Sequence, residues 1–297
     1  MFKTFEDVIA LAKSKGRKRI AVVEGASEEI VEGLKLAKEL AVPILIGDDE
    51  KIRKFAETHG ISGYEVIPST SPVESAFKAC ELVKKGEADF IMKGKIDTPT
   101  FLRALLDKEK GIRTDKIFSH ITLLEIPNYH KLVFLTDAGM NIRPDLKMKI
   151  SILQNAIDVM KTMGYNEIKV AFLASLETLH EDMPETIEFA AISKLQDRSF
   201  FKGVKVYLDG PMGFDIAVSK RAAELKGVTS VVSGDADLWM VPDVASGNIL
   251  AKALIYIAKA KAGGLIYGAK VPVVLLSRAD EPELKYYSIA FAVAACG

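Results

Sequence analysis

Short apolar runs alternate along this chain with longer stretches in which apolar residues recur at helical spacing. Residues 28–40 predict a helix with one apolar face formed by Ile30, Leu34, Ala37 and Leu40. Residues 50–59 predict another helix that stops at Gly60. Runs rich in β-branched residues predict strands at 19–23, 42–46, 88–92, 132–136, 169–173, 204–208, 238–241, 264–267 and 271–276. Most of these runs are apolar throughout, which is typical of strands covered on both faces. The alternation predicts the α/β class with mainly parallel sheets.

One segment departs from this alternation. Residues 116–126 form an apolar run that reaches the next predicted strand, 131–136, through the short Pro-Asn-Tyr-His turn at 127–130. Two strands joined by a short turn, with no helix between them, form an antiparallel pair. We therefore expect an antiparallel pair here, of the kind that marks a domain edge or an interface.

The composition excludes several classes of partner. Lys and Arg total 40 and Asp and Glu also total 40, so the formal net charge of the 297 residues is zero. Such a balance provides no basic field for nucleic acid or for an anionic membrane surface. The hydrophobic fraction of 49% and the charged fraction of 27% are typical of a globular protein. Two cysteines, Cys80 and Cys296, argue against a disulfide scaffold and favour a reducing compartment.

Targeting signals are not apparent in the sequence. No apolar run reaches the roughly 18 residues of a membrane-spanning helix. The first 19 residues place their basic cluster after an amphipathic stretch, which is the reverse of a signal peptide. We expect a cytoplasmic protein with small-molecule substrates and without a nucleic acid or membrane partner.

The candidate chemistry lies just after the predicted strands, because ligands of parallel sheets bind outside the carboxyl ends of strands. In the first cluster, Lys93, Gly94 and Lys95 end a strand, and Asp97 or Thr98 then begins a helix. Free N–H groups and the positive end of a helix dipole suit a phosphate, and the lysines add charge. Arg103 lies in the same helix and could reach back towards its start. A capped surface helix with solvated lysines explains the pattern equally well.

Three further clusters supply polar groups after strands, but each has an ordinary structural explanation. Asp137 and Asn141 follow one strand, as the residues of a plain β–α loop also would. Asp215 stands at the start of a helix, where a carboxylate is favoured for structural reasons alone. Asn248 follows the strand at 238–241. Acidic residues around this strand raise the question of a metal, but its extended length separates Asp237 from Asp243 by about 20 Å. We therefore predict no metal site.

The fifth cluster follows the last predicted strand. Ser277 and Arg278 come first, and Asp280 and Glu283 follow them closely. Arginine can bind a phosphate or carboxylate in bidentate fashion, and a nearby carboxylate can transfer a proton. A helix-capping loop is the alternative, and it explains the acidic residues better than it explains the Ser-Arg pair.

Common catalytic signatures are missing from the sequence. The chain contains no HExxH metal motif, no GxSxG nucleophile elbow and no GxGxxG dinucleotide fingerprint. The GxxxxGK[ST] phosphate loop is also absent, so nucleotide hydrolysis is not indicated. A buried thiol is the expected state of both cysteines, which leaves covalent cysteine catalysis without support.

Taken in order, the clusters resemble the phosphate acetyltransferase and phosphate butyryltransferase family over nearly the whole chain. The segments that carry the resemblance are MKGKIDTPTFLRALLDKEKGIRT, SHITLLEIPNYHK, TDAGMNIRP, DGPMGFDIAVS, GDADLWMVPDVASGNILAKAL and LSRADEPELKYYSIA, and they look closer to the butyryltransferase branch. The resemblance implies two α/β/α domains with an interdomain cleft, an isocitrate/isopropylmalate dehydrogenase-like architecture. We place the first domain at 1–117 plus 269–297 and the second at 118–268. Homodimers or higher homo-oligomers are also implied.

The activity that the resemblance implies is reversible transfer of a short acyl group, butyryl by preference, between coenzyme A and inorganic phosphate through a ternary complex. Coenzyme A is then a substrate, and no cofactor is bound tightly. Arg103, Ser277 and Arg278 match catalytic positions of the family, with the arginines binding phosphate and stabilising the oxyanion. Phosphate binding is assigned to Lys93, Lys95 and Thr98, and cleft positions to Asp137, Asn141, Asp215 and Asn248.

The general base departs from the family pattern. Acetyl-branch enzymes carry an Asp seven residues after the serine, whereas this chain has Leu284 there. Glu283 and Asp280 are the substitute candidates. Other functions stay open: phosphate acetyltransferase specificity, a metal- and NAD(P)-dependent decarboxylating dehydrogenase, or a catalytically silent scaffold with the same fold.

Overall fold

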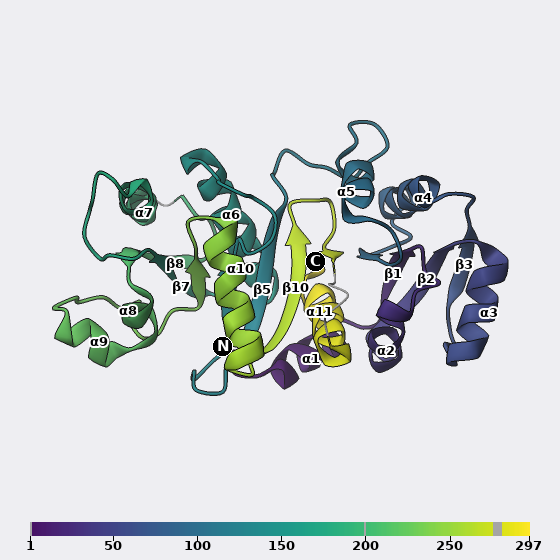
Figure 1. Cartoon of the computed structure of the whole chain (residues 1–297), viewed down its shortest axis with the longest axis horizontal. Coiled ribbons are helices and arrows are strands. Elements are labelled where there is room, and N and C mark those ends of the chain that lie inside the picture. The colour runs from purple at the N-terminus through teal and green to yellow at the C-terminus, as the bar shows by residue number, and fades with distance from the viewer. Residues whose placement is uncertain (1, 199, 276–280) are drawn as a thin grey trace. The chain divides into compact units, whose positions relative to one another are not determined.

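The computed structural model describes residues 2–198, 200–275 and 281–297. The chain divides into two compact units (Figure 1). We call Glu6–Phe118 with Gly263–Gly297 the terminal unit, and Met1–Phe5 with Ser119–Ala262 the central unit. The division predicted from sequence differs from these units at residues 1–5, 118 and 263–268.

The terminal unit is built on a mainly parallel sheet with the strand order β3-β2-β1-β4-β11. Its strands are β1 (Lys18–Val23), β2 (Ala41–Gly47), β3 (Glu65–Pro68), β4 (Phe90–Lys93) and β11 (Val273–Val274). The end of β10 (Lys261–Tyr267) pairs antiparallel to β11 through Ile266 and Val273. The chain leaves β1 for β2 on one side, while β4 lies on the other side. The loops that follow β1 and β4 therefore diverge at a topological switch point, where ligands bind in open α/β sheets.

Helices α1 (Phe5–Ser14), α2 (Glu28–Leu36), α3 (Asp49–His59), α4 (Pro72–Lys85), α5 (Thr98–Leu106) and α11 (Pro282–Ala295) accompany this sheet. Local sequence explains their limits. Ser71 caps α4 by accepting a hydrogen bond from the Glu74 N–H, and Gly86 ends the helix with a φ of 72°. The helix predicted at 28–40 ends earlier, at Leu36, because residues 37–40 form a turn that leads into β2.

The core of the terminal unit surrounds β1 and α11. The side chains of Ile20–Val23 are fully buried, and α11 is buried along 288–295. Gly33 allows α2 to approach α11, because a Cβ there would lie 2.8 Å from the Cβ of Lys285. Strand β3 was not predicted, since it is short and only half-buried and its sequence, EVIP, lacks an apolar run. Within the described part of the chain, no helix combines the length and apolar character needed to cross a membrane.

The central unit contains the predicted antiparallel pair, which is confirmed. Strand β5 (Ser119–Glu125) runs antiparallel to β6 (Val133–Thr136), with Ile121 opposite Thr136. The strand order is β5-β6-β9-β7-β8, and β6, β9 (Leu238–Met240), β7 (Glu167–Leu173) and β8 (Lys205–Met212) are parallel. The helical segments are α6 (Leu146–Thr162), α7 (Pro184–Ser193), η1 (Lys194–Arg198), α8 (Phe214–Val218), α9 (Lys220–Leu225), α10 (Val244–Lys252) and η2 (Ala253–Ile257).

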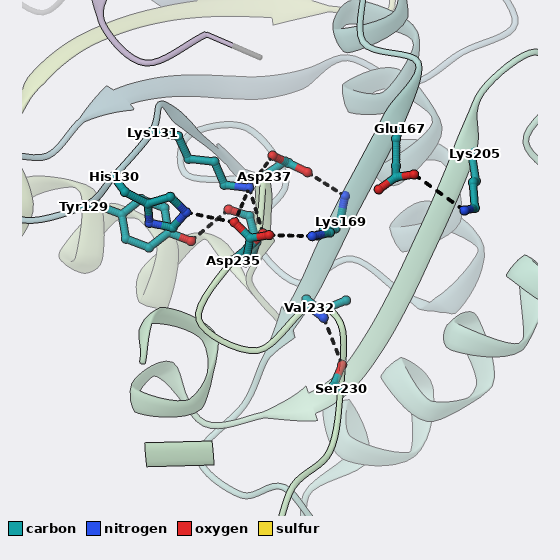
Figure 2. A network of polar contacts seen from close by, with 11 residues as sticks. Tyr129, His130, Lys131, Glu167, Lys169, Lys205, Ser230, Val232, Asp235 and Asp237 are labelled. Atoms are coloured by element: carbon teal, nitrogen blue, oxygen red, sulfur yellow. Dashed lines mark hydrogen bonds and ion pairs between the residues drawn. The ribbon is translucent and has the colours of Figure 1, made fainter. Parts of the chain in front are cut away.

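A network of buried and partly buried charges joins the amino ends of three of these strands (Figure 2). Lys131, which precedes β6, is 1% exposed, and its Nζ lies 2.6 Å from Oδ1 of Asp237. The backbone of Asp237 bridges β6 and β7, because its carbonyl accepts the Phe134 N–H at 2.8 Å and its N–H donates to the Lys169 carbonyl at 2.8 Å. The side chain of Lys169 donates to Asp235. These contacts account for both acidic residues without a metal.

The electrostatics of Asp235 make this network sensitive to acid. Burial would raise the pKa of this carboxyl, but hydrogen bonds from Lys169, His130 and Lys131 outweigh burial and hold the pKa well below its usual value. A carboxylate with a depressed pKa stabilises the folded state above its unfolded pKa of about 3.9. This contribution is therefore constant from pH 5 to 8 and declines as the pH falls below about 4.

We predict that Lys131→Met lowers the free energy of unfolding by about 3 kcal/mol or more, because Asp237 is then left charged and buried without its partner. Urea unfolding followed by circular dichroism measures the change. Lys85→Met is the matched control, since Lys85 pairs with Glu81 at the surface, where both side chains are more than half exposed. Equal midpoints for the two variants would contradict a stabilising role for the network.

Candidate functional site

In the terminal unit, the loop after β4 lies directly against the end of β1. The Gly94 N–H donates to the Val23 carbonyl at 2.8 Å, and the Lys95 N–H donates to the Glu24 carbonyl at 3.1 Å. A Cβ at Gly94 would collide with both carbonyl oxygens, so only glycine fits there. We call residues 93–97 the 93–97 loop. The switch point of the sheet therefore places this loop at the carboxyl ends of β1 and β4.

The 93–97 loop leads into α5. Asp97 is the cap residue, since its Oδ1 accepts the Thr100 N–H at 2.9 Å, and Thr98 is the first residue of the helix. Hydrogen bonds from the backbone N–H of Thr100, and then from its side chain, hold the pKa of Asp97 below its usual value. Arg103 is exposed, and its Nε donates to the Pro99 carbonyl at 3.4 Å. Its side chain thus extends back towards the start of α5, as the sequence predicted.

The two lysines of the 93–97 loop have different environments. Lys93 is half-buried, and its Nζ donates to the carbonyls of Gly94 at 3.1 Å and Ile96 at 2.9 Å. Lys95 is exposed and lines a pocket of about 280 Å³ together with Glu24, Gly25, Gly47, Asp48, Lys51 and other residues. The alternative of a solvated lysine fits Lys95 but not Lys93. Lys93 thus stabilises the conformation of the loop, whereas Lys95 faces a pocket.

In the central unit, the loop after β6 is organised around Asp137, which is 3% exposed. Its Oδ1 accepts the N–H groups of Gly139 and Met140, each at 2.9 Å. Its Oδ2 accepts the backbone N–H of Asn141 at 3.2 Å and the side-chain amide of Asn141 at 2.5 Å. Asn248 of α10 donates to the Ala138 carbonyl at 3.3 Å. The structure thus brings Asp137, Asn141 and Asn248 together.

The fourth cleft candidate, Asp215, has other partners. It lies in the first turn of α8, where Gly213 is the cap residue. An oxygen of Asp215 lies 3.1 Å from Nζ of Lys226, which also lies 3.5 Å from Glu177. The hydrogen bond from Lys226 lowers the pKa of Asp215. The carboxylate is therefore part of a surface ion pair rather than a helix cap.

The predicted Ser277, Arg278 and Asp280 lie outside the described residues. Glu283, the fourth member of that cluster, is exposed in the first turn of α11. Glu281 occupies the cap position of α11 without a side-chain hydrogen bond to the helix. Of the fifth cluster, the described residues thus place only Glu283, on the solvent side of the start of α11.

The cysteines are buried, as predicted, and burial raises the pKa of each thiol to about 12. A thiol in that state is a poor nucleophile at neutral pH. His120 contacts Thr122, with 3.4 Å between the His120 Nδ1 and the Thr122 Oγ1, and the exposed His130 contacts Asp235. Over residues 2–198, 200–275 and 281–297, no three His, Cys, Asp or Glu side chains are grouped to hold a metal ion.

Sequence reasoning missed Glu24. This residue follows β1 directly, lines the same pocket as Lys95 and has a φ of 56°. Its Oε1 accepts a hydrogen bond from the Ser75 hydroxyl at 2.5 Å. The available signal was the Glu-Gly pair directly after the apolar run at 19–23, which has the same form as the clusters that were singled out.

Comparisons with known proteins point to one family. Residues 69–293 match the family model described as phosphate acetyl/butaryl transferase. The chain is 40% identical to a phosphate butyryltransferase of Clostridium acetobutylicum over an alignment of 301 positions, which covers 100% of this chain and 99% of that protein. It is 38% identical to a phosphate acetyltransferase of Thermotoga maritima, with 96% of this chain and 97% of that protein covered.

Solved structures agree with these sequence relatives. A branched-chain phosphotransacylase from Enterococcus faecalis matches with a TM-score of 0.81 and 30% identity, covering 94% of this chain and 99% of that chain. A 4-hydroxythreonine-4-phosphate dehydrogenase from Klebsiella pneumoniae matches with a TM-score of 0.59 and 14% identity, covering 94% of this chain and 100% of that chain. The second match concerns the fold alone. It gives the dehydrogenase-like architecture loose support.

Proposed function

The chain belongs to the phosphate acetyl/butaryl transferase family, and we propose on this basis that it transfers a short acyl group, butyryl by preference, reversibly between coenzyme A and inorganic phosphate. The observation that carries the proposal is the 40% identity to a phosphate butyryltransferase across 100% of this chain and 99% of that protein. Because the similarity spans both units, it includes every cluster of candidate residues. Coenzyme A is a substrate here, and no tightly bound cofactor is required.

The reaction needs positive groups and N–H donors that are in place before the substrates react. A phosphate oxygen attacks the thioester carbonyl carbon, a C–O bond forms, and the carbonyl oxygen becomes negative. The C–S bond then breaks and coenzyme A leaves as a thiolate that takes up a proton. Preorganised donors stabilise the oxyanion more than they stabilise the ground state. The start of α5, with Lys95 and Arg103 beside it, supplies such donors in the terminal unit.

Roles for individual residues follow from this chemistry. Arg103 and Arg278 bind phosphate and stabilise the oxyanion, and Ser277 donates a hydrogen bond to the reacting group. Thr98, the first residue of α5, contributes its N–H and its hydroxyl at the positive end of the helix, and Lys95 contributes charge. Lys93 assists by fixing the carbonyls of the 93–97 loop.

The central unit contributes groups that bind substrate. The loop after β6 and the start of α10 present Asn141 and Asn248, and Asp137 holds that loop in shape. Asp215 lies beside Lys226, which can bind an anionic part of coenzyme A once the ion pair opens. We also propose that the chain forms two α/β/α domains, one at 1–117 plus 269–297 and the other at 118–268.

We also propose that the protein assembles as a homodimer or a higher homo-oligomer. A row of exposed, mostly apolar side chains along α10 and η2 supports this assembly: Ile249, Ala253, Tyr256 and Ile257. Ile257 is 82% exposed and Ile249 is 70% exposed. Contiguous apolar surface of this kind is typical of protein interfaces.

The proposed function predicts that free coenzyme A appears from butyryl-CoA only when inorganic phosphate is present. A thiol reagent that absorbs on reaction with coenzyme A follows the release. Acetyl-, propionyl- and branched acyl-CoA are compared by kcat/KM, where one methylene is worth about 1–3 kcal/mol, or roughly 10- to 200-fold. A higher kcat/KM for acetyl-CoA would favour phosphate acetyltransferase specificity. Phosphate-independent release, or none with any acyl-CoA, would contradict the proposal.

Arg103→Ala should lower kcat for butyryl-CoA by about 100- to 1,000-fold, because one oxyanion donor is removed. Arg103→Lys keeps the positive charge but loses the planar guanidinium group, so its kcat should lie between those of the wild type and Arg103→Ala. Arg221→Ala is the control, since Arg221 is an exposed arginine that pairs with Glu224 at the surface. A loss of less than tenfold in Arg103→Ala would remove Arg103 from the catalytic set.

The proposed base is a carboxylate that accepts the proton of the coenzyme A thiol when the reaction runs towards acyl-CoA, and Glu283 and Asp280 are its candidates. Glu283→Gln removes the basic group while keeping the shape, so turnover of butyryl phosphate with coenzyme A should fall by about 100-fold or more. Glu281→Gln controls for the loss of one charge at the start of α11. Asp280→Asn tests the other candidate in the same assay. Near-normal rates in both Glu283→Gln and Asp280→Asn would eliminate both candidates.

A further inference from the structure

Glu24 has an unusual backbone for its residue type. It directly follows β1 and has a φ of 56°, in the left-handed region. This conformation is unfavourable in free energy for a residue other than glycine, so it persists only where neighbouring contacts hold it. One such contact is with the 93–97 loop, since the Glu24 carbonyl accepts the Lys95 N–H at 3.1 Å. The strained residue therefore supports the loop to which phosphate binding is assigned.

The side chain of Glu24 is anchored on its other side by α4. Its Oε1 accepts the Ser75 hydroxyl at 2.5 Å, and the Ser75 side chain is fully buried. Ser75 in turn shares a hydrogen bond with the hydroxyl of Ser69. The Ser69 N–H donates to the Gly47 carbonyl at the end of β2, at 2.7 Å. A chain of hydrogen bonds thus connects the end of β2 and α4 to the carboxylate of Glu24.

The 93–97 loop cannot move freely against this anchor. Gly94 is in van der Waals contact with the backbone of Val23 and Glu24, and a single Cβ would not fit between them. A change in the backbone of Glu24 is therefore transmitted directly to Gly94 and Lys95. Helix α5 begins three residues after Lys95, at Thr98.

We propose that Glu24 is a positioning residue for phosphate, with Ser75 as its anchor: it sets the placement of the 93–97 loop and of the first turn of α5. This inference rests on the proposed function. Glu24 does not bind the phosphate, because its carboxylate would repel a dianion. It acts through the hydrogen bond from Lys95 and the contact with Gly94. Donors that must be in place before reaction lose their effect when displaced by about 1 Å.

The test uses substitutions that distinguish the effect of the Glu24 side-chain contact from the effect of its backbone conformation. Glu24→Asn keeps a residue that tolerates the left-handed region but is too short to reach Ser75. Its KM for inorganic phosphate should rise about tenfold to a hundredfold, as expected for a displaced binding group. The KM for butyryl-CoA and the thermal midpoint should stay near wild type. Glu24→Gln keeps the length and an acceptor for Ser75, so its phosphate KM should stay within about threefold of wild type.

Ser75 of α4 and Ser71, the cap residue of the same helix, provide a matched pair. Ser75→Ala removes the anchor and should raise the phosphate KM as Glu24→Asn does. Ser71→Ala removes the cap of α4, at 3.3 Å from the Glu74 N–H, and should lower the thermal midpoint without changing the phosphate KM. The double variant Glu24→Asn/Ser75→Ala should be no worse than Glu24→Asn alone, because both changes remove the same hydrogen bond.

A wild-type phosphate KM in Glu24→Asn would overturn the inference, as would a Glu24→Gln variant as impaired as Glu24→Asn. An equal rise of the phosphate KM in Ser71→Ala and Ser75→Ala would also overturn it, because helix stability would then explain the effect. The wild-type chain shows phosphate-dependent release of coenzyme A in the same assay. If that release is absent, the proposed function itself fails, so the two failures are distinguishable.

Discussion

The absence of a side chain at Gly94 is the constraint on which the terminal unit's candidate site depends. Two N–H groups of the 93–97 loop bond to the carbonyls of Val23, the last residue of β1, and of Glu24, the residue after it, and this packing leaves no space for a Cβ. The contact occurs where β1 and β4 are neighbours but their onward connections diverge. An open sheet has an exposed crevice at such a point. Here the crevice is bordered by a loop of fixed shape, and its exposed cation, Lys95, faces a pocket of about 280 Å³.

The two units use buried polar groups for different purposes. At the amino ends of β6, β7 and β9, lysines and aspartates neutralise one another, and the backbone of Asp237 holds the three strands in order. At the carboxyl ends of strands, polar side chains bond mostly to loop backbone. Lys93 donates to carbonyls of the 93–97 loop, and Asp137 accepts N–H groups of the loop after β6. The first arrangement stabilises the sheet. The second gives loops defined shapes while leaving groups such as Lys95 and Arg103 exposed to solvent.

Most of the fold could be predicted from sequence because buried strands are long apolar runs, and the antiparallel pair was signalled by the short turn at 127–130. Strand β3 could not be, since two of its four residues are exposed and none is fully buried. For the candidate site, position after a strand was sufficient to single out Lys95 and Asp137, and the helix that carries Arg103, as candidates. It could not tell that Lys93 is bonded to backbone carbonyls or that Asp215 is paired with Lys226, because these partners depend on side-chain geometry. Glu24 was missed although the same rule applies to it.

A chain with zero formal net charge can still handle two anionic substrates, because charge acts over short distances. At physiological ionic strength the screening length is about 8 Å. One exposed lysine, an arginine in the second turn of the next helix and the positive end of that helix therefore act on a nearby anion, whatever the charge of residues beyond the screening length. Fixing the backbone makes these few groups effective, because the donors need not reorganise when charge develops on the substrate. For that reason the residues that shape the 93–97 loop, Gly94 above all, matter as much to the proposed chemistry as the cations themselves.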